Sequence, residues 1–472
     1  MERDRAESTV RRWGSLAVVA FVFLVDGWTA GFWFHNDDFL WIHDAARATR
    51  SSDPFGPFEA GWWDSSFFRP LVHFSYHVTY RLAGTNSLPY HVTNLALHAT
   101  VTLLGFRIAY RVLGASTWAL VATLLFAAHP TGSAAVAWVS GRTELLCGVF
   151  YLGALLAHLH ARPWVALLLF VAALCSKETA FSLPLAVAGM RLFRIERSEG
   201  KPSPVWPYFV VAGSYLLVRY RVTDEFAPGV LGLSATNPLT LDRAIGLLRG
   251  KITMLGQYLF EPLPLRGFWR SVLAFCVVFV MAETLARRGD ALGRSAIRFG
   301  LFFVPVAILP YAGWQGFQPW YAYLAIWGSA LAASGCCRVL FAMAGRFRCA
   351  LAVFLVVWLA ASVVSREIHS ETERQAGVWS RAVLEEFVRR VRDPQPGTVF
   401  VVSGLERLRL GLEPGAPKAL FVFGFEEGLR LAYRDSTLSV VFGDRATPLL
   451  FAGQRPKVYL RWDSRTRSFV PD

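Results

Sequence analysis

Charged residues are scarce in this chain, and their scarcity rules out a single soluble globular unit. Only 17% of the 472 residues are Asp, Glu, Lys or Arg, whereas 54% are hydrophobic, and the hydrophobic residues occur in repeated long runs. One soluble core cannot bury so much apolar surface, but runs of about 20 apolar residues are long enough to cross a bilayer. The composition therefore predicts an α-helical polytopic membrane protein.

Cysteine is scarce too, and its distribution argues against a disulfide framework or a zinc knuckle. The six cysteines all fall within predicted spans or on the inner side of the membrane. The chain also lacks an internal repeat, a low-complexity segment and a glycine-rich nucleotide loop. Its net charge of +14 lies mainly in short loops beside apolar runs, where it meets lipid head groups, so nucleic acid is not a predicted partner.

Eleven apolar runs are predicted to span the membrane. They cover residues 14–34, 92–112, 117–136, 143–160, 163–176, 179–194, 205–222, 268–286, 297–313, 319–337 and 349–365. Pro130 interrupts the third run. The fifth and sixth are shorter than the usual ~20 residues and meet at Ser176-Lys177-Glu178 as a bent pair.

The distribution of basic residues predicts the orientation of these spans. With the N-terminus in the cytoplasm, the inner segments hold 18 Lys and Arg in 68 residues, and the outer segments hold 10 in 124. This difference satisfies the positive-inside rule. We expect a multi-pass protein of a bacterial inner membrane with a periplasmic C-terminus, although a protein of the endoplasmic reticulum would have the same topology.

Two domains are predicted. Residues 1–365 form the transmembrane domain, and residues 366–472 change to a mixed pattern typical of a small soluble α/β domain. The pattern indicates one amphipathic helix and four short strands, at residues 379–391, 398–403, 419–424, 438–443 and 457–462. Because the number of spans is odd, this domain lies on the outer side.

The outer loop at residues 35–91 carries the most informative residues, the adjacent acids Asp37 and Asp38. Paired carboxylates at the mouth of a span are costly and indicate a reaction site or an ion site. Trp63 and His91 lie in the same loop, which mixes aromatic and polar side chains. Aromatic rings stack on sugar faces and carboxylates accept hydrogen bonds from hydroxyl groups, so this mixture suits a sugar.

Six stretches resemble the GT-C superfamily of membrane glycosyltransferases, in particular its protein O-mannosyltransferase and TMTC-like branch. They are FHNDDFLWI, FFRPLVHFSYHVTYRL, YHVTNLALHATVTLL, LLFAAHPTGSAAVAWVSGRTELL, LCSKETAFSLP and, more weakly, FQPWYAYLAIWG. Apart from the last, they cover residues 32–190 nearly continuously. Glu144 stands where relatives usually have Asp, and Gln318-Pro319-Trp320-Tyr321 replaces a Glu-Arg-Tyr sequence that relatives often carry.

This resemblance implies a GT-C fold, a sugar donor carried on polyprenyl phosphate, a site at the outer face and inversion at the anomeric carbon. Asp37 and Asp38 take the position of the family's first-loop acids, as the general base or beside a metal, and Glu144 is a further catalytic candidate. A divalent cation is possible but not established, and any such ion would lie at Asp37 and Asp38. The implied partners are membrane lipid, the lipid-linked sugar and an acceptor that is a protein, a lipid or a glycan.

Cations at three outer corners, Arg69, Arg142 and Lys177, are predicted to converge on the donor phosphate. His129 and Glu178 stand at two of the same corners and are further candidates for the site. The oligomeric state is not indicated by the sequence.

Structural explanations remain open for the same residues. Asp38 would also serve as a helix N-cap, and the cations would also extend toward lipid head groups. His91 would pack inside a helix bundle, and His129 would shape the bend before Pro130.

Two other functions also remain open for the whole chain: a transporter or flippase of lipid-linked glycans, and an inactive scaffold with a GT-C-like fold. A transporter is expected to have polar residues at mid-depth in several spans. Here the polar residues gather at the outer ends, which favours the enzyme.

Overall fold

The computed structural model describes most of the chain. The described residues are 2–50, 67–196, 203–223, 240–263, 265, 267–312, 318–405, 409–410, 418–419, 421, 424–443 and 455–472.

The described part is mainly helical, as predicted. Its helices are α1 (Glu2–Asp26), α2 (Asp38–Arg50), α3 (Pro70–Ala83), α4 (Ser87–Leu113), α5 (Ser116–Ala127), α6 (Ser133–Val136), α7 (Arg142–Leu159), α8 (Pro163–Leu174), α9 (Leu183–Leu192), α10 (Trp206–Thr223), α11 (Leu241–Leu259), α12 (Phe268–Arg288), α13 (Ala291–Ile308), α14 (Tyr323–Met343), α15 (Arg348–Arg390) and α16 (Phe425–Tyr433). Short 3₁₀ turns at Val139–Gly141 (η5), Glu178–Ser182 (η6) and Pro319–Ala322 (η9) shape the loops that matter below.

Seven of the described helices are long and apolar enough to cross a membrane, namely α1, α4, α7, α12, α13, α14 and α15. A bent pair makes an eighth: α5 and the segment Pro130–Val136 meet at 62°, which confirms the predicted interruption at Pro130. The predicted count of eleven is not confirmed, because α8 and α9 have only 12 and 10 residues and α10 is not apolar enough. The chain is an integral membrane protein that crosses the membrane several times.

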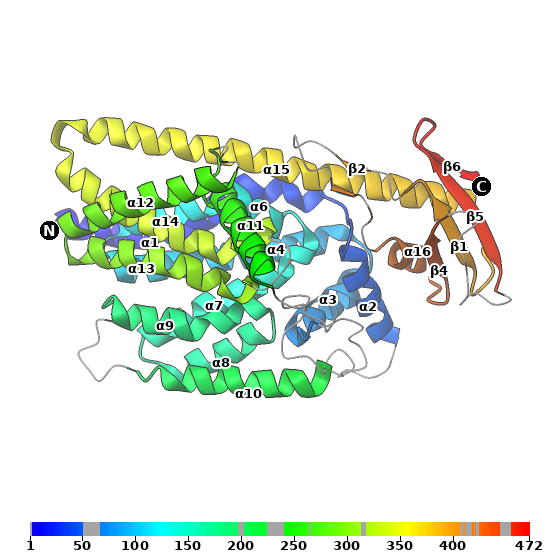
Figure 1. Cartoon of the computed structure of the whole chain (residues 1–472), viewed down its shortest axis with the longest axis horizontal. Helices are drawn as coiled ribbons and strands as arrows, with labels where there is room; N and C mark the ends of the chain where they lie inside the picture. Colours follow the sequence, from blue (N-terminus) through cyan, green and yellow to red (C-terminus); the bar gives the residue numbers. More distant parts are fainter. Residues whose placement is uncertain are drawn as a thin grey trace.

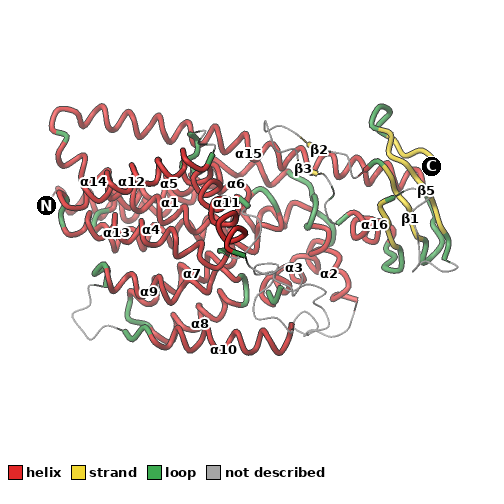
Figure 2. The backbone as a smooth tube through the Cα atoms, in the orientation of Figure 1, coloured by secondary structure: helices red, strands yellow, loops and turns green. Residues whose placement is uncertain are grey.

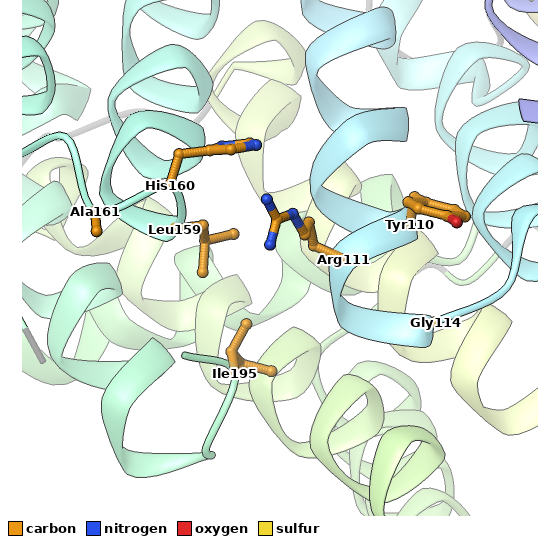
Figure 3. Close-up of a pocket in the computed structure, with 7 residues that line it drawn as sticks. All are labelled: Tyr110, Arg111, Gly114, Leu159, His160, Ala161 and Ile195. Atoms are coloured by element: carbon orange, nitrogen blue, oxygen red, sulfur yellow. The ribbon is translucent and has the colours of Figure 1, made fainter. Parts of the chain in front are cut away.

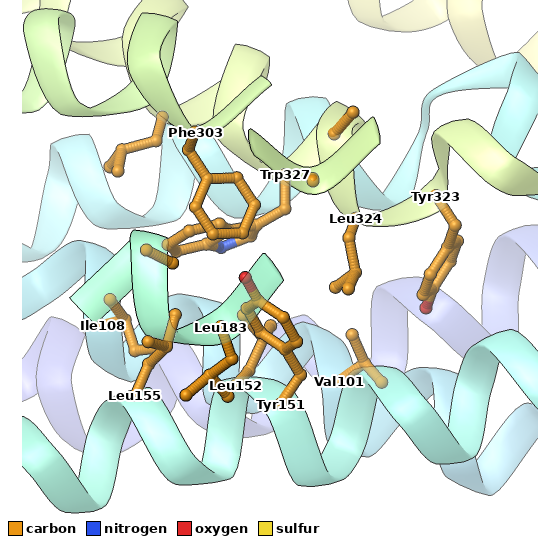
Figure 4. Close-up of a cluster of buried hydrophobic side chains, with 14 of the residues drawn as sticks. Val101, Ile108, Tyr151, Leu152, Leu155, Leu183, Phe303, Tyr323, Leu324 and Trp327 are labelled. Carbon is orange, nitrogen blue, oxygen red and sulfur yellow. The ribbon is translucent and has the colours of Figure 1, made fainter. Parts of the chain in front are cut away.

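The membrane core is built on close helix contacts. α13 and α14 approach each other at Gly300 and Gly328, where a Cβ on Gly300 would lie 2.5 Å from the carbonyl oxygen of Gly328. Small residues let helix backbones come this close, which supplies packing where lipid gives no hydrophobic drive. Figure 4 shows the aromatic rings that fill the neighbouring space, where Phe303 lies 5.1 Å from Trp327 and 5.9 Å from Tyr151 between ring centroids.

α15 joins the two ends of the molecule. It is a continuous helix of 43 residues, roughly 65 Å long, that begins at the end of the bundle where the N-terminus lies and reaches the C-terminal sheet at the other end (Figures 1 and 2). The predicted division between residues 365 and 366 falls inside it. α2 and α3 lie at the end of the bundle that faces the sheet (Figure 1).

The C-terminal region contains a four-stranded sheet in the order β4-β1-β5-β6. β1 (Val399–Ser403) is parallel to β4 (Ser439–Phe442) and β5 (Lys457–Asp463), and β6 (Ser468–Pro471) is antiparallel to β5. Three of the four predicted strands are thus confirmed. The fourth, at residues 419–424, lies partly outside the described residues, where β3 (Lys418–Ala419) pairs with β2 (Arg409–Leu410). Neither α16 nor β6 was predicted.

Candidate active site

Asp38 is buried and fixed by hydrogen bonds from two directions. Its Oδ1 accepts the backbone N–H of Ser140 at 2.8 Å and lies 2.6 Å from the Ser140 hydroxyl, and its Oδ2 accepts the N–H of His35 at 3.0 Å. The carboxylate therefore accepts a hydrogen bond from the residue three positions before it, as the acid of a capping box does. Among the described residues, it does not bond to the backbone N–H groups of α2. Asp38 ties the acidic loop, which we define as residues 32–38, to η5.

Asp37 has different surroundings, although it is the next residue along the chain. Its side chain is half-buried, and the hydrogen bond that affects its carboxylate comes from its own backbone. Burial and the charge of Asp38 raise the pKa of Asp37 to about 6, and His35 and Arg69 partly offset that rise. A partly accessible carboxylate with this pKa is suited to take a proton from a reacting group.

A charged cluster of five buried side chains lies beside the acidic loop. Arg69, just before α3, donates from Nη2 to Glu178 at 2.7 Å, and Arg219 of α10 lies 3.7 Å from the same carboxylate. Lys177, after α8, pairs with Glu144 of α7. Three cations thus lie with two carboxylates in this cluster of described residues, where buried charges are expected to be paired.

Aromatic rings connect the acidic loop to the charged cluster. His35 stacks on Trp138 at a centroid distance of 6.0 Å, and Trp138 contacts Trp320 at 4.8 Å. Tyr321 follows Trp320 in η9 and stacks on Tyr311 at 4.3 Å. The Nζ of Lys177 lies 5.2 Å from the centre of the Tyr321 ring. This aromatic wall is therefore continuous from one charged group to the other.

The structure brings together two of the three cations predicted to converge. Arg69 and Lys177 belong to the charged cluster, but Arg142 lies apart from it, in a polar pocket between helices. Its guanidinium donates to Asn94 Oδ1, to Thr79 Oγ1 and to the backbone oxygens of Ser75 and Tyr90, at 3.1–3.3 Å. These four hydrogen bonds and the ring of Tyr76, 4.3 Å away, hold Arg142 inside the fold.

The other candidates have various surroundings. Glu144 and Glu178 are both paired within the charged cluster. His91 is buried with its ring 6.0 Å from that of Phe32, and neither ring nitrogen has a hydrogen-bond partner among the described residues. His129 lies farther along the bundle, where its backbone oxygen accepts a hydrogen bond from Arg366. Trp63 lies outside the described residues.

Five further residues of the site were not predicted from the sequence. They lie in segments that only the tertiary fold assembles: Arg219, Trp138, Tyr311, Trp320 and Tyr321. Arg219 had a visible signal, because a cation within the predicted span at residues 205–222 is expensive and indicates a partner. The four aromatic residues had none, because rings are common throughout this chain.

An apolar cavity of 720 Å³ opens between α11, α12, α14 and α15. Apolar side chains dominate its lining, among them Phe275, Phe279 and Trp358. Its polar lining includes His129 and Glu261, and Glu261 accepts a hydrogen bond of 2.7 Å from Thr131. The cavity suits a long apolar chain.

A second cavity, of 430 Å³, lies at the end of the bundle away from the acidic loop, where α4, α7 and α9 end (Figure 3). Arg111 and His160 point into it in Figure 3. The bundle separates this cavity from the acidic loop, so it is not part of the site described here.

The described residues contain no group of three His, Cys, Asp or Glu side chains placed to hold a metal ion. The two residues predicted to lie nearest to any divalent cation, Asp37 and Asp38, have separate surroundings, and both oxygens of Asp38 already have hydrogen-bond donors.

The chain matches part of several curated proteins, although no protein-family model matches it. It is 32% identical over 126 residues to the protein O-mannosyl-transferase F38B6.6 of Caenorhabditis elegans, a match that covers 25% of this chain and 18% of that protein. It is 34% identical over 189 residues to the protein O-mannosyl-transferase Tmtc2 of Drosophila melanogaster, covering 36% and 20% respectively. The matches therefore span a fifth or less of these relatives.

The fold is similar to that of a solved oligosaccharyltransferase from Archaeoglobus fulgidus, which was crystallised with a tethered acceptor peptide. The TM-score is 0.51 at 13% sequence identity, and the match covers 92% of this chain and 64% of that one. The sequence matches and the shared fold confirm the predicted resemblance to the GT-C superfamily and its protein O-mannosyltransferase branch.

Proposed function

We propose that this chain is a membrane glycosyltransferase that moves a sugar from a polyprenyl-phosphate donor to an acceptor hydroxyl at the outer face of the membrane. The observation that carries the proposal is the position of Asp37, a half-buried carboxylate with a raised pKa, beside a charged cluster of three cations and two carboxylates. A base for the acceptor and a counter-charge for the leaving group are the two functions that this transfer requires.

The proposed reaction is a single inverting displacement. The acceptor oxygen attacks the anomeric carbon as its proton passes to the carboxylate of Asp37. The bond from the anomeric carbon to the phosphate oxygen breaks, and its electron pair leaves with the polyprenyl phosphate. Asp38 does not take part in proton transfer, because its oxygens accept hydrogen bonds that hold the loop in place.

Arg69, Lys177 and Arg219 are proposed to stabilise the phosphate as it gains charge. All three are buried, where water screens a charge poorly and electrostatic contacts are correspondingly strong. Glu144 and Glu178 hold two of these cations in fixed positions. The aromatic wall between the acidic loop and the cluster offers faces on which a sugar ring stacks.

The apolar cavity beside α12 and α15 supports a donor with a long lipid tail. It lies among membrane-spanning helices, and few of its lining groups are polar. A polyprenyl chain has no hydrogen-bonding groups along its length and gains from burial in such a lining. We propose that the tail lies here, in the membrane, while the phosphate lies at the charged cluster.

The acceptor and the location are proposals as well. The names of the curated relatives support mannose as the sugar and a protein hydroxyl as the acceptor. The basic residues of the inner segments support a cytoplasmic N-terminus and a periplasmic C-terminal region in a bacterial inner membrane.

Transfer of labelled mannose from polyprenyl-phosphate mannose, by the purified chain in detergent, tests the proposal. We expect Asp37→Asn to lower the transfer rate at least about 100-fold, since a positioned base contributes roughly 10²–10⁴-fold. Asp393→Asn, which changes an exposed carboxylate after α15, is the matched control and should keep full activity. Full transfer by Asp37→Asn would remove this carboxylate from the mechanism, and no transfer by the wild-type chain with any sugar or acceptor would contradict the proposed function.

A further inference from the structure

The acidic loop is in close contact with the C-terminal part of the chain at two glycines. Gly377 of α15 lies directly against Trp33, because a Cβ on Gly377 would be 2.6 Å from the Trp33 carbonyl oxygen. Gly424, the residue before α16, lies against Asn36, where a Cβ would be 2.1 Å from the backbone oxygen. Any side chain larger than hydrogen at either glycine would push the loop away.

Further contacts surround these two points. His35 Nε2 lies 3.2 Å from Glu373 Oε2, one turn before Gly377 on α15. Phe39, which follows the loop, lies 6.4 Å from Phe421 between ring centroids. The loop and α15 therefore meet through charged and backbone groups, and the start of α2 meets the segment before α16 through aromatic rings.

The C-terminal region and the acidic loop share a single hydrophobic core. Phe34, Phe39 and Ile42 from the loop and α2 are buried in the same cluster as Phe387 of α15 and Phe425 of α16. The burial of these rings stabilises both parts at once, at about 25 cal/mol for each Å² removed from water. The cluster also includes Tyr76 of α3 and Tyr90 of α4, so the loop is packed between the bundle and the C-terminal region.

Backbone geometry at Asn36 depends on these contacts. Asn36 has a φ of +50°, a left-handed conformation that few residues other than glycine adopt, and it immediately precedes Asp37. Surrounding structure must hold such a conformation in place. Gly424 presses on Asn36 from one side, and Ser140 holds Asp38 from the other. Asp37 thus lies between two fixed points.

We propose that Gly377 and Gly424 are positioning residues, through which the C-terminal region sets the location of Asp37 for sugar transfer. This inference rests on the proposed function. The C-terminal region would then act as a support for the acidic loop rather than as a separate binding module. A displacement of about 1 Å in a reacting group is enough to slow an enzyme roughly 100-fold.

Two pairs of alanine variants of the full chain, in detergent, test this inference. Gly424→Ala is compared with Gly397→Ala, since both glycines have a positive φ but the nearest group to a Cβ on Gly397 is 3.9 Å away. Gly377→Ala is compared with Gly213→Ala, since both glycines are helical and a Cβ on Gly213 meets nothing within 4 Å. Within each pair the backbone effect of alanine is matched, and only the contact with the loop differs.

Two measurements are made on each variant: the kcat for mannose transfer with its pH profile, and amide hydrogen exchange at Asp38 and Phe39. We expect Gly424→Ala and Gly377→Ala to lower kcat about 100-fold, to shift the acid limb of the profile and to speed the exchange of both amides. Gly397→Ala and Gly213→Ala should leave all three readouts close to those of the wild type.

Equal kcat, pH profile and exchange within both pairs would overturn the inference, even if the wild type transfers sugar. If the wild type transfers nothing, the proposed function fails, and the exchange measurement alone decides whether the two glycines position the loop. Loss of activity with unchanged exchange would also count against positioning.

Discussion

Two adjacent carboxylates in this protein have different roles because their neighbours differ. Asp38 is fully buried with a donor on each oxygen, and Asp37 beside it is only half-buried. Burial raises the pKa of Asp37 most, and the charge of Asp38 raises it further, since ionising both places two negative charges together. Asp38, which holds the loop in place, therefore also raises the pKa of Asp37, the proposed base.

The pH dependence of transfer follows from this arrangement. A general base acts only when it is ionised, so we expect the rate to fall as the pH drops through about 6, rather than near 4 as for an ordinary aspartate. The transfer rate of the wild type, measured between pH 4.5 and 8 with saturating donor, checks this. An acid limb near pH 4 would mean that Asp37 is not the base.

The same raised pKa has the opposite effect on stability. The folded state holds the proton of Asp37 more tightly than the unfolded state does, so ionising Asp37 lowers the free energy of unfolding as the pH rises toward about 6. Asp37→Asn removes this effect and should be at least as stable as the wild type above pH 6. Thermal unfolding of both proteins at pH 7.5 checks this sign.

The cations of the charged cluster should contribute to donor binding, whereas Arg142 should contribute to stability. Arg69→Ala is expected to weaken binding of polyprenyl phosphate about 10-fold or more, because a hydrogen bond to a charged group contributes roughly 1.5–3 kcal/mol. Arg142→Ala should lower the melting temperature instead, since it removes four hydrogen bonds, three of them to buried acceptors. Arg338→Ala, which removes an ion pair with Asp290, is the control for binding. Equal affinity in Arg69→Ala and Arg338→Ala would argue against a phosphate at this site.

Among the elements, α15 is attached to the bundle by a buried ion pair. Arg366 donates to both oxygens of Asp26, at the end of α1, at 2.7 and 3.1 Å, and His98 of α4 lies 3.7 Å from the same carboxylate. A third hydrogen bond from Arg366 reaches the backbone of His129, next to the bend at Pro130. One side chain thus joins α15, α1 and the bent pair.

Breaking this pair from one side should be costly. Arg366→Met leaves the carboxylate of Asp26 buried without its partner, for which we expect a loss of about 3–5 kcal/mol in the free energy of unfolding. The double variant Asp26→Asn, Arg366→Met removes both charges and should recover part of that loss. Thermal or denaturant unfolding in detergent measures both. A double variant less stable than the single one would show that the two residues act independently.

The elements also show how far a sequence specifies this fold. The long apolar runs and three strands of the sheet were predictable, because hydrophobic period and length depend only on local sequence. The short helices α8 and α9 were placed as a bent pair, but their number of crossings cannot be read from composition. Arg142 lies apart from the other two predicted phosphate ligands because its partners, Asn94 and Tyr90, come from a different helix. The acidic pair could be picked out as a candidate because the cost of two carboxylates beside a span is visible in the local sequence, while the aromatic wall depends on tertiary contacts.

At the scale of the whole molecule, the ends of the bundle are distinct. The N-terminus lies at the end opposite the acidic loop and the C-terminal sheet (Figure 1). A reporter that is active only outside the cytoplasm should therefore work when fused after Asp472 and fail when inserted at Gly345, between α14 and α15. The reverse result would mean that the orientation is inverted and that the acidic loop lies in the cytoplasm.

The continuous α15 makes the bilayer part of the geometry of the acidic loop. Because the helix has no break between its membrane segment and Gly377, it tilts as a rod. Gly377 lies about 44 Å from the start of the helix, so a tilt of about 5° would move it by roughly 4 Å. Helices respond to a change in membrane thickness by tilting. Lipid composition would thereby change the distance between the carboxylate of Asp37 and its substrate.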